Sequence, residues 1–393
     1  MTLKPGWLFF LPWSLDSVGG VNRVVVELCR EMHRQGEYHP FIMIDSWADS
    51  HARIVDKDFY TEIHYRIREP LTESNTVKAS LLFLAYLPTE LIRLRLMFKK
   101  YNIQVLNPHY FTLSASLLSV YRYVFGKSVK IFASLHGADL LAIEASPPSK
   151  RFIYLAMLRR MDQVVTCSNG LKKKAAKLGE GLRLHAIPNG FSDDVSRSIP
   201  IEGVGPTLPK SPYILSVATF ENKKGLDVLI AAYYRLTPEN PELELVLVGR
   251  SGPALREIQV QIEKLCLQSR VHIFTDVFPH SMAAFYQHAL MFVLPSRYEP
   301  FGIVLLEAAV NRVPVISTRT MGGGEIISDG ENGLLVDIED QTALQLAIEQ
   351  FINDPVMAER LSESLYSKVV VTYTWERACD AYIALFKDAF YGV

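Results

Sequence analysis

The sequence predicts an α/β protein made of two doubly wound, parallel-sheet domains that face a central cleft. Three observations lead to this prediction. Short apolar strands alternate with helical patterns in two successive zones, which is typical of parallel sheets covered on both faces. Residues 192–212, between the zones, are rich in Pro, Gly and Ser and are interpreted as a linker. The length of 393 residues, with 49% hydrophobic and 21% charged residues, fits about two globular domains.

The first zone opens with an apolar segment at residues 7–11, which we expect to form a buried strand. After it, valines, a leucine and a methionine between Val21 and Met32 recur at helical spacing. An amphipathic helix is therefore expected to begin at the Gly-Gly turn just before them. Further strands are expected at residues 41–44, 103–106, 129–134, 164–166 and 185–187.

The second zone repeats the alternation more clearly. It begins with a strand at residues 213–217 and a helix at 226–236. We expect further strands near residues 243–248, 271–274, 290–294, 313–316 and 333–336, and helices near 253–267, 303–310 and 375–390. In sheets of this kind, ligands bind at the carboxyl ends of the strands.

Composition excludes several classes of protein. A net charge of −1 argues against a general nucleic-acid binder, which needs an excess of positive charge. The four cysteines form no CxxC pair, so they indicate neither a zinc knuckle nor a disulfide framework, and a reducing cytosol is expected. We identify no signal peptide, and the apolar stretch at 80–88 is too short to span a bilayer. The protein is therefore expected in the cytoplasm, or at most peripherally at the inner face of the membrane.

The segment PSRYEPFGIVLLEAAV, residues 295–310, carries the first candidate site. Pro300 and Gly302 follow the end of a strand and lead into a helix, whose first N–H groups form an anion site. Glu299 lies beside this site, and Glu307 lies two turns along the helix. A carboxylate binds a vicinal diol, and a nucleotide sugar has diols on both sides of its diphosphate. The alternative is a solvated helix acid and a turn acid.

Three shorter motifs add candidate groups. Lys223 and Lys224 lie in a loop after a strand and are placed to meet phosphate charge, or are simply solvated. Glycines 322–324, followed by an acid and an expected short helix, form either an anion-binding nest or a flexible loop. In the first zone, His136 of LHGAD is a general acid, a hydrogen-bond donor or a structural histidine, and Pro188-Asn189-Gly190 forms a turn.

Taken together, these motifs resemble the retaining glycosyltransferases of family 4, which have the GT-B fold of two Rossmann-like domains. The resemblance rests first on the EX7E signature, Glu299-Pro-Phe-Gly…Glu307, and extends over nearly the whole chain in the expected order. The other matches are Gly19-Gly20, His136-Gly137…Asp139, Pro188-Asn189-Gly190, Lys224-Gly225, Gly322–Glu325, Asp329-Gly330…Asn332-Gly333 and Trp375.

The resemblance implies a role for each matching residue. The catalytic residues would be Glu299 facing the donor sugar, Lys224 on the diphosphate and His136 beside the transferred sugar. The donor-binding residues would be Gly20, Lys223, Arg250, Phe301, Gly302, Ile303 and Glu307, the last on the ribose. Gly19, Asp139 and Asn189 would lie in the cleft or at the acceptor. The resemblance requires no metal and no cofactor.

The resemblance also implies an activity (EC 2.4, hexosyltransferase type). Residues 1–200 would bind a glycan or lipid-linked acceptor, with helix 374–393 packed back on them, and residues 201–373 would bind a UDP- or GDP-sugar. Polysaccharide, lipopolysaccharide or glycolipid assembly is the expected setting. A non-catalytic, nucleotide- or partner-binding subunit of the same fold is the alternative. A nicotinamide oxidoreductase is disfavoured, because Gly19-Gly20 lacks the G-x-G-x-x-G spacing.

One position departs from the family pattern. Thr219 stands where the family usually has an arginine before its lysine. Loss of one such stabilising donor costs about 3–4 kcal/mol in other enzymes. Either Lys223 or Arg250 supplies the missing charge, and we favour Lys223, or the protein is slow or inactive.

Two signals remain outside these motifs. Residues 87–101, LPTELIRLRLMFKKY, mix aliphatic and basic side chains. They form either a packed helix with solvated cations or a helix on a membrane surface. Asp56-Lys57-Asp58 matches the DxD metal signature of a different glycosyltransferase fold and is interpreted as coincidence.

Overall fold

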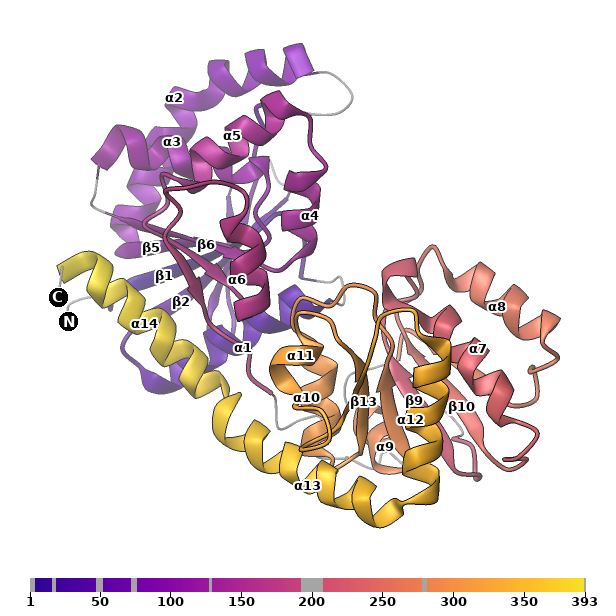
Figure 1. The fold of residues 1–393 in the computed structure, drawn as a ribbon. Helices are drawn as coiled ribbons and strands as arrows, with labels where there is room; N and C mark the ends of the chain where they lie inside the picture. Colours follow the sequence, from indigo (N-terminus) through magenta and orange to yellow (C-terminus); the bar gives the residue numbers. More distant parts are fainter. Residues whose placement is uncertain are drawn as a thin grey trace. The chain divides into compact units, whose positions relative to one another are not determined.

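The structure is a computed structural model that describes residues 4–15, 19–46, 52–71, 76–126, 129–191, 208–277 and 281–391. The chain divides into two compact units (Figure 1). Unit 1 contains residues 1–188 and 375–393, and unit 2 contains residues 189–374. The first unit therefore ends before the predicted boundary at residue 200. Most of the predicted linker, residues 192–207, lies outside the described residues.

Unit 1 is an α/β unit around an eight-stranded sheet of order β3-β4-β2-β1-β5-β6-β7-β8 in the described part of the chain. Its strands are β1 (Gly6–Leu11), β2 (His39–Asp45), β3 (Arg53–Asp56), β4 (Thr61–Tyr65), β5 (Ile103–Pro108), β6 (Lys130–Leu135), β7 (Gln163–Thr166) and β8 (Leu184–Ala186). Its helices are α1 (Gly20–Gln35), α2 (Thr76–Lys100), η1 (Leu113–Ala115), α3 (Ser116–Phe125), α4 (Ala138–Glu144), α5 (Pro148–Leu158), α6 (Asn169–Ala176) and α14 (Trp375–Tyr391).

The strands predicted for the first zone are present, and the pairs from β4 through β8 are parallel. Strand β1 is an unbroken apolar run with every residue buried, as expected for a central strand covered on both faces. The sequence did not predict the β3–β4 hairpin, whose two strands pair antiparallel, so the sheet is mixed. The DxD motif lies at the turn of this hairpin, and Asp56 accepts a hydrogen bond from Thr61 at 2.8 Å.

Helix α14 follows all of unit 2 in the chain but packs against α1 and β6 of unit 1. Phe386 and Tyr382 of this helix are buried, and their ring centroids lie 5.9 and 6.3 Å from that of Trp7 in β1. These aromatic contacts join the last helix of the described chain to its first strand, so unit 1 is complete only when α14 is in place.

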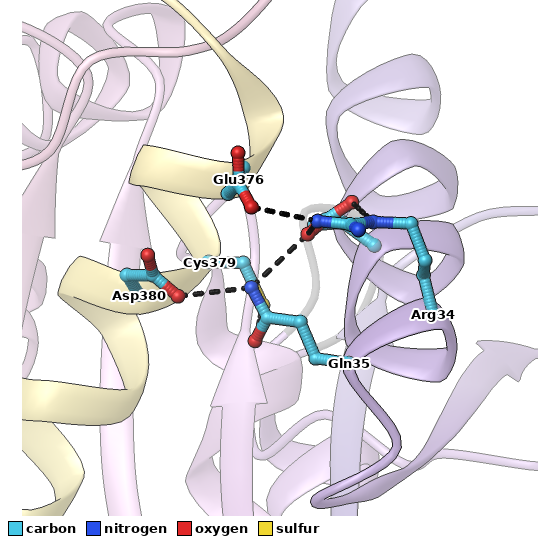
Figure 2. A network of polar contacts seen from close by, with 6 residues as sticks. Arg34, Gln35, Glu376, Cys379 and Asp380 are labelled. Atoms are coloured by element: carbon cyan, nitrogen blue, oxygen red, sulfur yellow. Dashed lines mark hydrogen bonds and ion pairs between the residues drawn. The ribbon is translucent and has the colours of Figure 1, made fainter.

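A polar network runs along the rim of the same interface (Figure 2). Arg34 of α1 pairs with Glu376 of α14 at 2.9 Å, and the amide of Gln35 donates to Asp380 at 2.9 Å. Arg34 and Glu376 are 60% and 62% exposed. Exposed pairs contribute little to stability, so the buried aromatic contacts dominate the docking of α14, and the rim sets its register.

Unit 2 has a six-stranded parallel sheet of order β11-β10-β9-β12-β13-β14 in its described part. Its strands are β9 (Tyr213–Val217), β10 (Glu244–Gly249), β11 (Val271–Thr275), β12 (Met291–Leu294), β13 (Val315–Thr318) and β14 (Leu334–Val336). Its helices are η4 (Asn222–Lys224), α7 (Leu226–Leu236), α8 (Leu255–Lys264), α9 (Met282–Gln287), α10 (Ile303–Val310), α11 (Gly323–Ile326), α12 (Gln341–Asn353) and α13 (Pro355–Thr372).

The second zone agrees with its prediction closely, and β9, α7 and α10 have the predicted bounds. From β9 the chain adds β10 and β11 on one side of the sheet, and then adds β12, β13 and β14 on the other side. The order of the strands therefore reverses between the neighbours β9 and β12. Such a switch point opens a crevice at the carboxyl ends of the strands. The two parallel-sheet α/β units predicted from the sequence are therefore confirmed. Among the described residues, no helix is both long and apolar enough to cross a bilayer.

Candidate functional site

In unit 2, the loops that leave β9 and β12 are held together at the switch point. The backbone N–H groups of Arg297 and Tyr298 donate to the carbonyl of Lys223 at 2.9 and 3.1 Å. These two hydrogen bonds bring Lys224 and Glu299, which are far apart in the sequence, next to each other. The Lys224 ammonium donates to the Glu299 carboxylate at 2.7 Å. The structure thus joins two of the three predicted catalytic side chains.

The Lys224–Glu299 pair is largely desolvated, with side chains 17% and 10% exposed. In such surroundings each charge stabilises the other, and removal of one leaves a charge without compensation. A ligand phosphate that approaches Lys224 would be attracted by the ammonium and repelled by the carboxylate. A sugar hydroxyl beside Glu299 would donate to that carboxylate. The pair therefore offers a cation and an acceptor side by side.

Gly225 makes this arrangement sterically feasible. Its φ of +64° lies in the left-handed region, and a Cβ atom there would come within 2.1 Å of the Pro295 carbonyl oxygen. Only glycine therefore allows the loop after β9 to lie directly on the loop after β12. This close approach sets the position of Lys224, the preceding residue.

Arg297 ties the same two loops together from the side. Its guanidinium binds both carboxylate oxygens of Asp227 at 2.7 and 2.8 Å, and also the Asn222 carbonyl and Glu339. Burial raises the pKa of Asp227, but the hydrogen bonds and charge of Arg297 outweigh this and lower it. A bidentate pair fixes both distance and orientation. Arg297 is therefore a structural clamp beneath Lys224.

Glu307 lies on α10 and is buried, as is Glu299. The Glu307 carboxylate accepts a hydrogen bond from the Tyr286 hydroxyl at 2.7 Å. The alternative interpretation of Glu307 as a solvated helix residue is therefore wrong, whereas Glu299 does lie in the turn before α10. A buried carboxylate held by a tyrosine is oriented in advance for a further donor, such as a ligand hydroxyl.

The amino end of α10 lies where the sequence predicts an anion site. Gly302 caps the helix with a φ of +91°, and the first-turn N–H groups of a helix have no acceptor within the helix itself. Phe301 is buried and Ile303 begins the helix. The positive end of the helix dipole thus lies directly after Glu299 in the chain.

The glycine motif at 322–324 is tied to this site, because Gly322 N–H donates to the Glu299 carbonyl at 2.9 Å. The expected helix does not follow the glycines. Instead α11 begins at Gly323 and includes Gly324. At Gly322, just before this helix, a Cβ would lie 2.0 Å from the Phe301 carbonyl oxygen, so the turn into the helix requires glycine there. A Cβ at Gly324, in contrast, would meet nothing within 4 Å.

Lys223 and Arg250 differ in their surroundings. The Lys223 ammonium pairs with Glu221 at 2.5 Å. The Arg250 carbonyl accepts the N–H of Phe220 at 3.0 Å, so the backbone of Arg250 runs beside Thr219. Lys223 must give up an ion pair to bind a phosphate, and the backbone of Arg250 lies next to the position where the resemblance leads us to expect an arginine.

In unit 1, Gly19 and Gly20 open α1 at the carboxyl end of β1. Gly19 has extended backbone that any residue adopts, and a Cβ at either position would meet nothing within 4 Å. Neither packing nor backbone conformation in the described chain therefore requires glycine here. The approach of a donor group to this turn stays a prediction.

Asp139 organises the turn after β6. Its buried carboxylate accepts the N–H groups of Phe111, His136, Gly137 and Leu140 at 2.8–3.1 Å. Burial raises its pKa, and these four hydrogen bonds oppose the rise. The structure thus gives Asp139 a local role in holding His136. Asn189, also predicted in the cleft, is buried just after β8 in the chain.

His136 is the outer end of a hydrogen-bonded chain. Its Nε2 lies 3.0 Å from Nδ1 of buried His109, whose Nε2 lies 3.3 Å from Oδ1 of Asn107. Asn107 Nδ2 donates to the Phe132 carbonyl at 2.8 Å, which fixes Oδ1 as the group that faces His109. Asn107 thus accepts from His109, and His109 in turn accepts from His136.

This series of hydrogen bonds fixes the tautomers of the His109 and His136 rings. Burial lowers the pKa of His109 well below its usual value and lowers the pKa of His136 to about 4, so both rings are neutral near pH 7. His109 then carries its proton on Nε2, and His136 carries its proton on Nε2 as well. His136 is partly exposed, and the ring nitrogen left as a hydrogen-bond acceptor is Nδ1.

Sequence reasoning missed three residues of these sites: His109, Tyr286 and Arg297. His109 directly follows β5 just as His136 directly follows β6, and the pairing of these two parallel strands was the signal that could have found it. No group of three or more His, Cys, Asp or Glu side chains in the described residues is arranged to hold a metal ion.

Comparison with known proteins gives two family matches. Residues 203–368 match the model described as glycosyl transferases group 1, and residues 18–195 match glycosyltransferase family 4. The chain is 30% identical over 232 residues to the lipopolysaccharide core biosynthesis glycosyltransferase LpsE of Rhizobium meliloti, covering 59% of this chain and 66% of that one. It is 29% identical over 234 residues to glycogen synthase of Mycobacterium tuberculosis, covering 57% and 54%. The matches thus span about half to two thirds of these relatives.

Solved structures show the same fold over nearly the whole chain. Sucrose-phosphate synthase from Thermosynechococcus elongatus has a TM-score of 0.78 at 22% identity, covering 99% of this chain and 100% of that one. Anabaena HepE in complex with UDP and glucose has a TM-score of 0.75 at 14% identity, covering 98% and 100%. At these identities the likeness shows the fold alone.

The close approach at Gly225 leads to a stability prediction. Gly225→Ala adds a left-handed alanine, at about 1–2 kcal/mol, and a clash with the backbone of the neighbouring loop. Gly330→Ala is the matched control, because Gly330 has a φ of +73° but open space around it. Denaturant unfolding should show at least twice the loss for Gly225→Ala. Equal losses would mean that the two loops are not in contact.

Proposed function

The chain belongs to the family 4 glycosyltransferases of the GT-B fold, and we propose that it transfers a sugar from a nucleotide-sugar donor to a hydroxyl group with the anomeric configuration retained. The observation that carries this proposal is the Lys224–Glu299 pair, 2.7 Å apart, directly before the amino end of α10. A cation, an acceptor and a helix dipole in one place match the diphosphate and sugar of such a donor. We propose that unit 2 binds the donor and unit 1 the acceptor.

In the proposed reaction, the bond between the sugar C1 and the phosphate oxygen breaks, and its electron pair leaves with the nucleoside diphosphate. The Lys224 ammonium and the first N–H groups of α10 stabilise that charge as it develops. The acceptor oxygen bonds to C1 on the same face, and its proton passes to the departing phosphate oxygen. Glu307 accepts from the ribose hydroxyls, and Glu299 accepts from a hydroxyl of the donor sugar. The proposal invokes no metal.

His136 has a specific part in this proposal. Since Nε2 donates to His109, the ring offers Nδ1 to a hydroxyl of the transferred sugar as an acceptor. His109 is then a positioning residue, because it acts on the sugar only through His136.

UDP- or GDP-sugars are the proposed donors, and a glycan or lipid-linked acceptor in polysaccharide, lipopolysaccharide or glycolipid assembly is the proposed acceptor class. The sequence relatives named above support this setting. The second candidate function is a non-catalytic subunit that binds a nucleotide or a partner. Thr219, in place of a cation, is the observation that favours it.

A donor panel tests the function. UDP-, GDP- and ADP-sugars are mixed with the protein and EDTA, and thermal stabilisation and nucleoside diphosphate release are measured. We expect the sugars of one nucleotide base to stabilise the protein, and their nucleoside diphosphate to be released slowly. Lys224→Ala should abolish release. Lys223→Ala and Arg250→Ala are compared, and the variant with the larger loss identifies the cation that replaces the one missing at Thr219. If a donor stabilises the protein without release of its nucleoside diphosphate, and Thr219→Arg restores that release, the non-catalytic function is established. No stabilisation by any donor would contradict a donor site.

Gly20 gives a second test that separates function from folding. Alanine at this position meets open space at the start of a helix, where it is more favourable than glycine by up to about 1 kcal/mol. Gly20→Ala should therefore leave the unfolding midpoint unchanged or raise it. Release of the nucleoside diphosphate should fall at least roughly tenfold, which corresponds to about 1.4 kcal/mol. Unchanged release would show that no donor group approaches this turn.

His109 gives a third test. His109→Leu leaves the Nε2–H of His136 without its acceptor, which costs about 1–3 kcal/mol and lowers kcat roughly 5- to 150-fold. His109→Asn places an oxygen near the lost Nδ1 and should recover most of the activity. In the wild type, transfer should stay level from pH 7 to pH 5 and fall as the pH approaches the His136 pKa of about 4. If nitrogen NMR finds His136 protonated at Nδ1, the proposed series of hydrogen bonds from His136 through His109 to Asn107 is wrong.

A further inference from the structure

Helix α2 of unit 1 is apolar on two opposite sides. Its inner side packs into the unit through Phe83, Leu91, Leu94 and Phe98, which are all buried. Its outer side carries further aliphatic residues that remain exposed: Val77, Leu81, Leu82, Leu84, Ile92 and Leu96. Leu81 and Leu96 are each 64% exposed. A helix that only covers a sheet has a polar outer side, so a second apolar side indicates a further contact.

The charges on α2 are of one sign wherever they are exposed. Arg93, Arg95, Lys99 and Lys100 are exposed along its second half. The helix has a single carboxylate, Glu90, and it is engaged: the Tyr65 hydroxyl donates to it, and Arg93 binds it at 3.2 Å. The outer side of α2 therefore combines aliphatic side chains with cations and presents no exposed carboxylate.

A groove runs between α2 and the β3–β4 hairpin. Its volume is about 550 Å³, and its lining includes Arg66, Arg68, Arg93, Lys100, Tyr86 and Tyr101. The Arg68 guanidinium lies over the Tyr86 ring, 4.2 Å from its centroid. Glu90 is the one carboxylate among the lining residues of the groove. Guanidinium groups and tyrosines at the edge of an apolar surface suit a phosphate that belongs to an amphiphile.

We propose that the outer side of α2 docks on an anionic lipid surface. The aliphatic residues enter the interfacial layer, and the cations of α2 and the groove bind lipid phosphates. The helix lies flat, since no helix of the described chain is able to span a bilayer. This proposal is independent of the sugar-transfer reaction and can fail without it.

The charge pattern favours lipid over a second copy of the chain. A self-pairing face places like charges opposite one another, and cations opposite cations are unfavourable. Anionic lipid headgroups, in contrast, neutralise each exposed arginine and lysine while the acyl chains take up the leucine side chains.

Flotation with vesicles tests the proposal. The full chain is mixed with phosphatidylcholine vesicles with or without phosphatidylglycerol. We expect it to float with the anionic vesicles and to be released by high salt. The triple variant Leu81→Ser, Ile92→Ser, Leu96→Ser should bind at least roughly tenfold more weakly, since each loses apolar area that enters the interface. Arg93→Gln with Lys100→Gln should remove the preference for anionic vesicles.

A matched control comes from unit 2. Leu346, Val356 and Val371 are also aliphatic and exposed, at 57%, 75% and 59%. Replacing all three by serine should leave flotation unchanged, and circular dichroism checks that both triple variants fold. Absence of flotation with anionic vesicles, or equal loss in the control triple, would overturn the proposal. A wild-type dimer that the α2 triple converts to a monomer, without flotation of either, would assign the face to a second copy instead.

Discussion

The candidate site of unit 2 depends on the pairing of Lys224 with Glu299 in largely desolvated surroundings. Each charge is tolerable there because the other is present. The pair in turn needs two loops in contact, which the backbone bonds to the Lys223 carbonyl, the absence of a side chain at Gly225 and the Arg297–Asp227 clamp together provide. A phosphate that binds Lys224 would therefore compete with Glu299 for this ammonium, whose position is already fixed.

The two units prepare their residues in different ways. In unit 2 a network of ion pairs and close backbone contacts orients the groups. In unit 1 the two histidine rings are neutral, and a series of hydrogen bonds from Asn107 through His109 determines which nitrogen of His136 remains as an acceptor. Burial keeps both rings uncharged, so the chain keeps one direction near pH 7. In the proposed reaction the leaving phosphate gains negative charge while C1 of the sugar gains positive charge, and a neutral His136 adds no further positive charge beside that sugar.

The sequence predicted most of unit 2 because its strands are rich in apolar residues and alternate regularly with amphipathic helices. It did not predict the β3–β4 hairpin, because β3 has only four residues and is mostly exposed, and β4, although buried, includes Thr, Glu and His among its five residues. Helix α2 begins at Thr76, well before the helix predicted at residues 87–101. The prediction began too late because Pro88 lies inside the helix, and a proline ordinarily indicates a helix boundary. The His109–His136 and Tyr286–Glu307 contacts arise from the positions of neighbouring elements in three dimensions, which no spacing along the chain reveals.

The membership of α14 in unit 1 has a consequence for biosynthesis. A ribosome releases unit 2 before it releases the helix that covers Trp7 and the inner side of α1. Throughout that interval the aromatic surface beneath α14 is open, while all of unit 2 has already emerged and is able to fold. The nascent chain thus carries an unfinished first unit for as long as the second takes to be made. A chaperone that recognises exposed aromatic residues would find its binding site there, and arrival of α14 would end that binding.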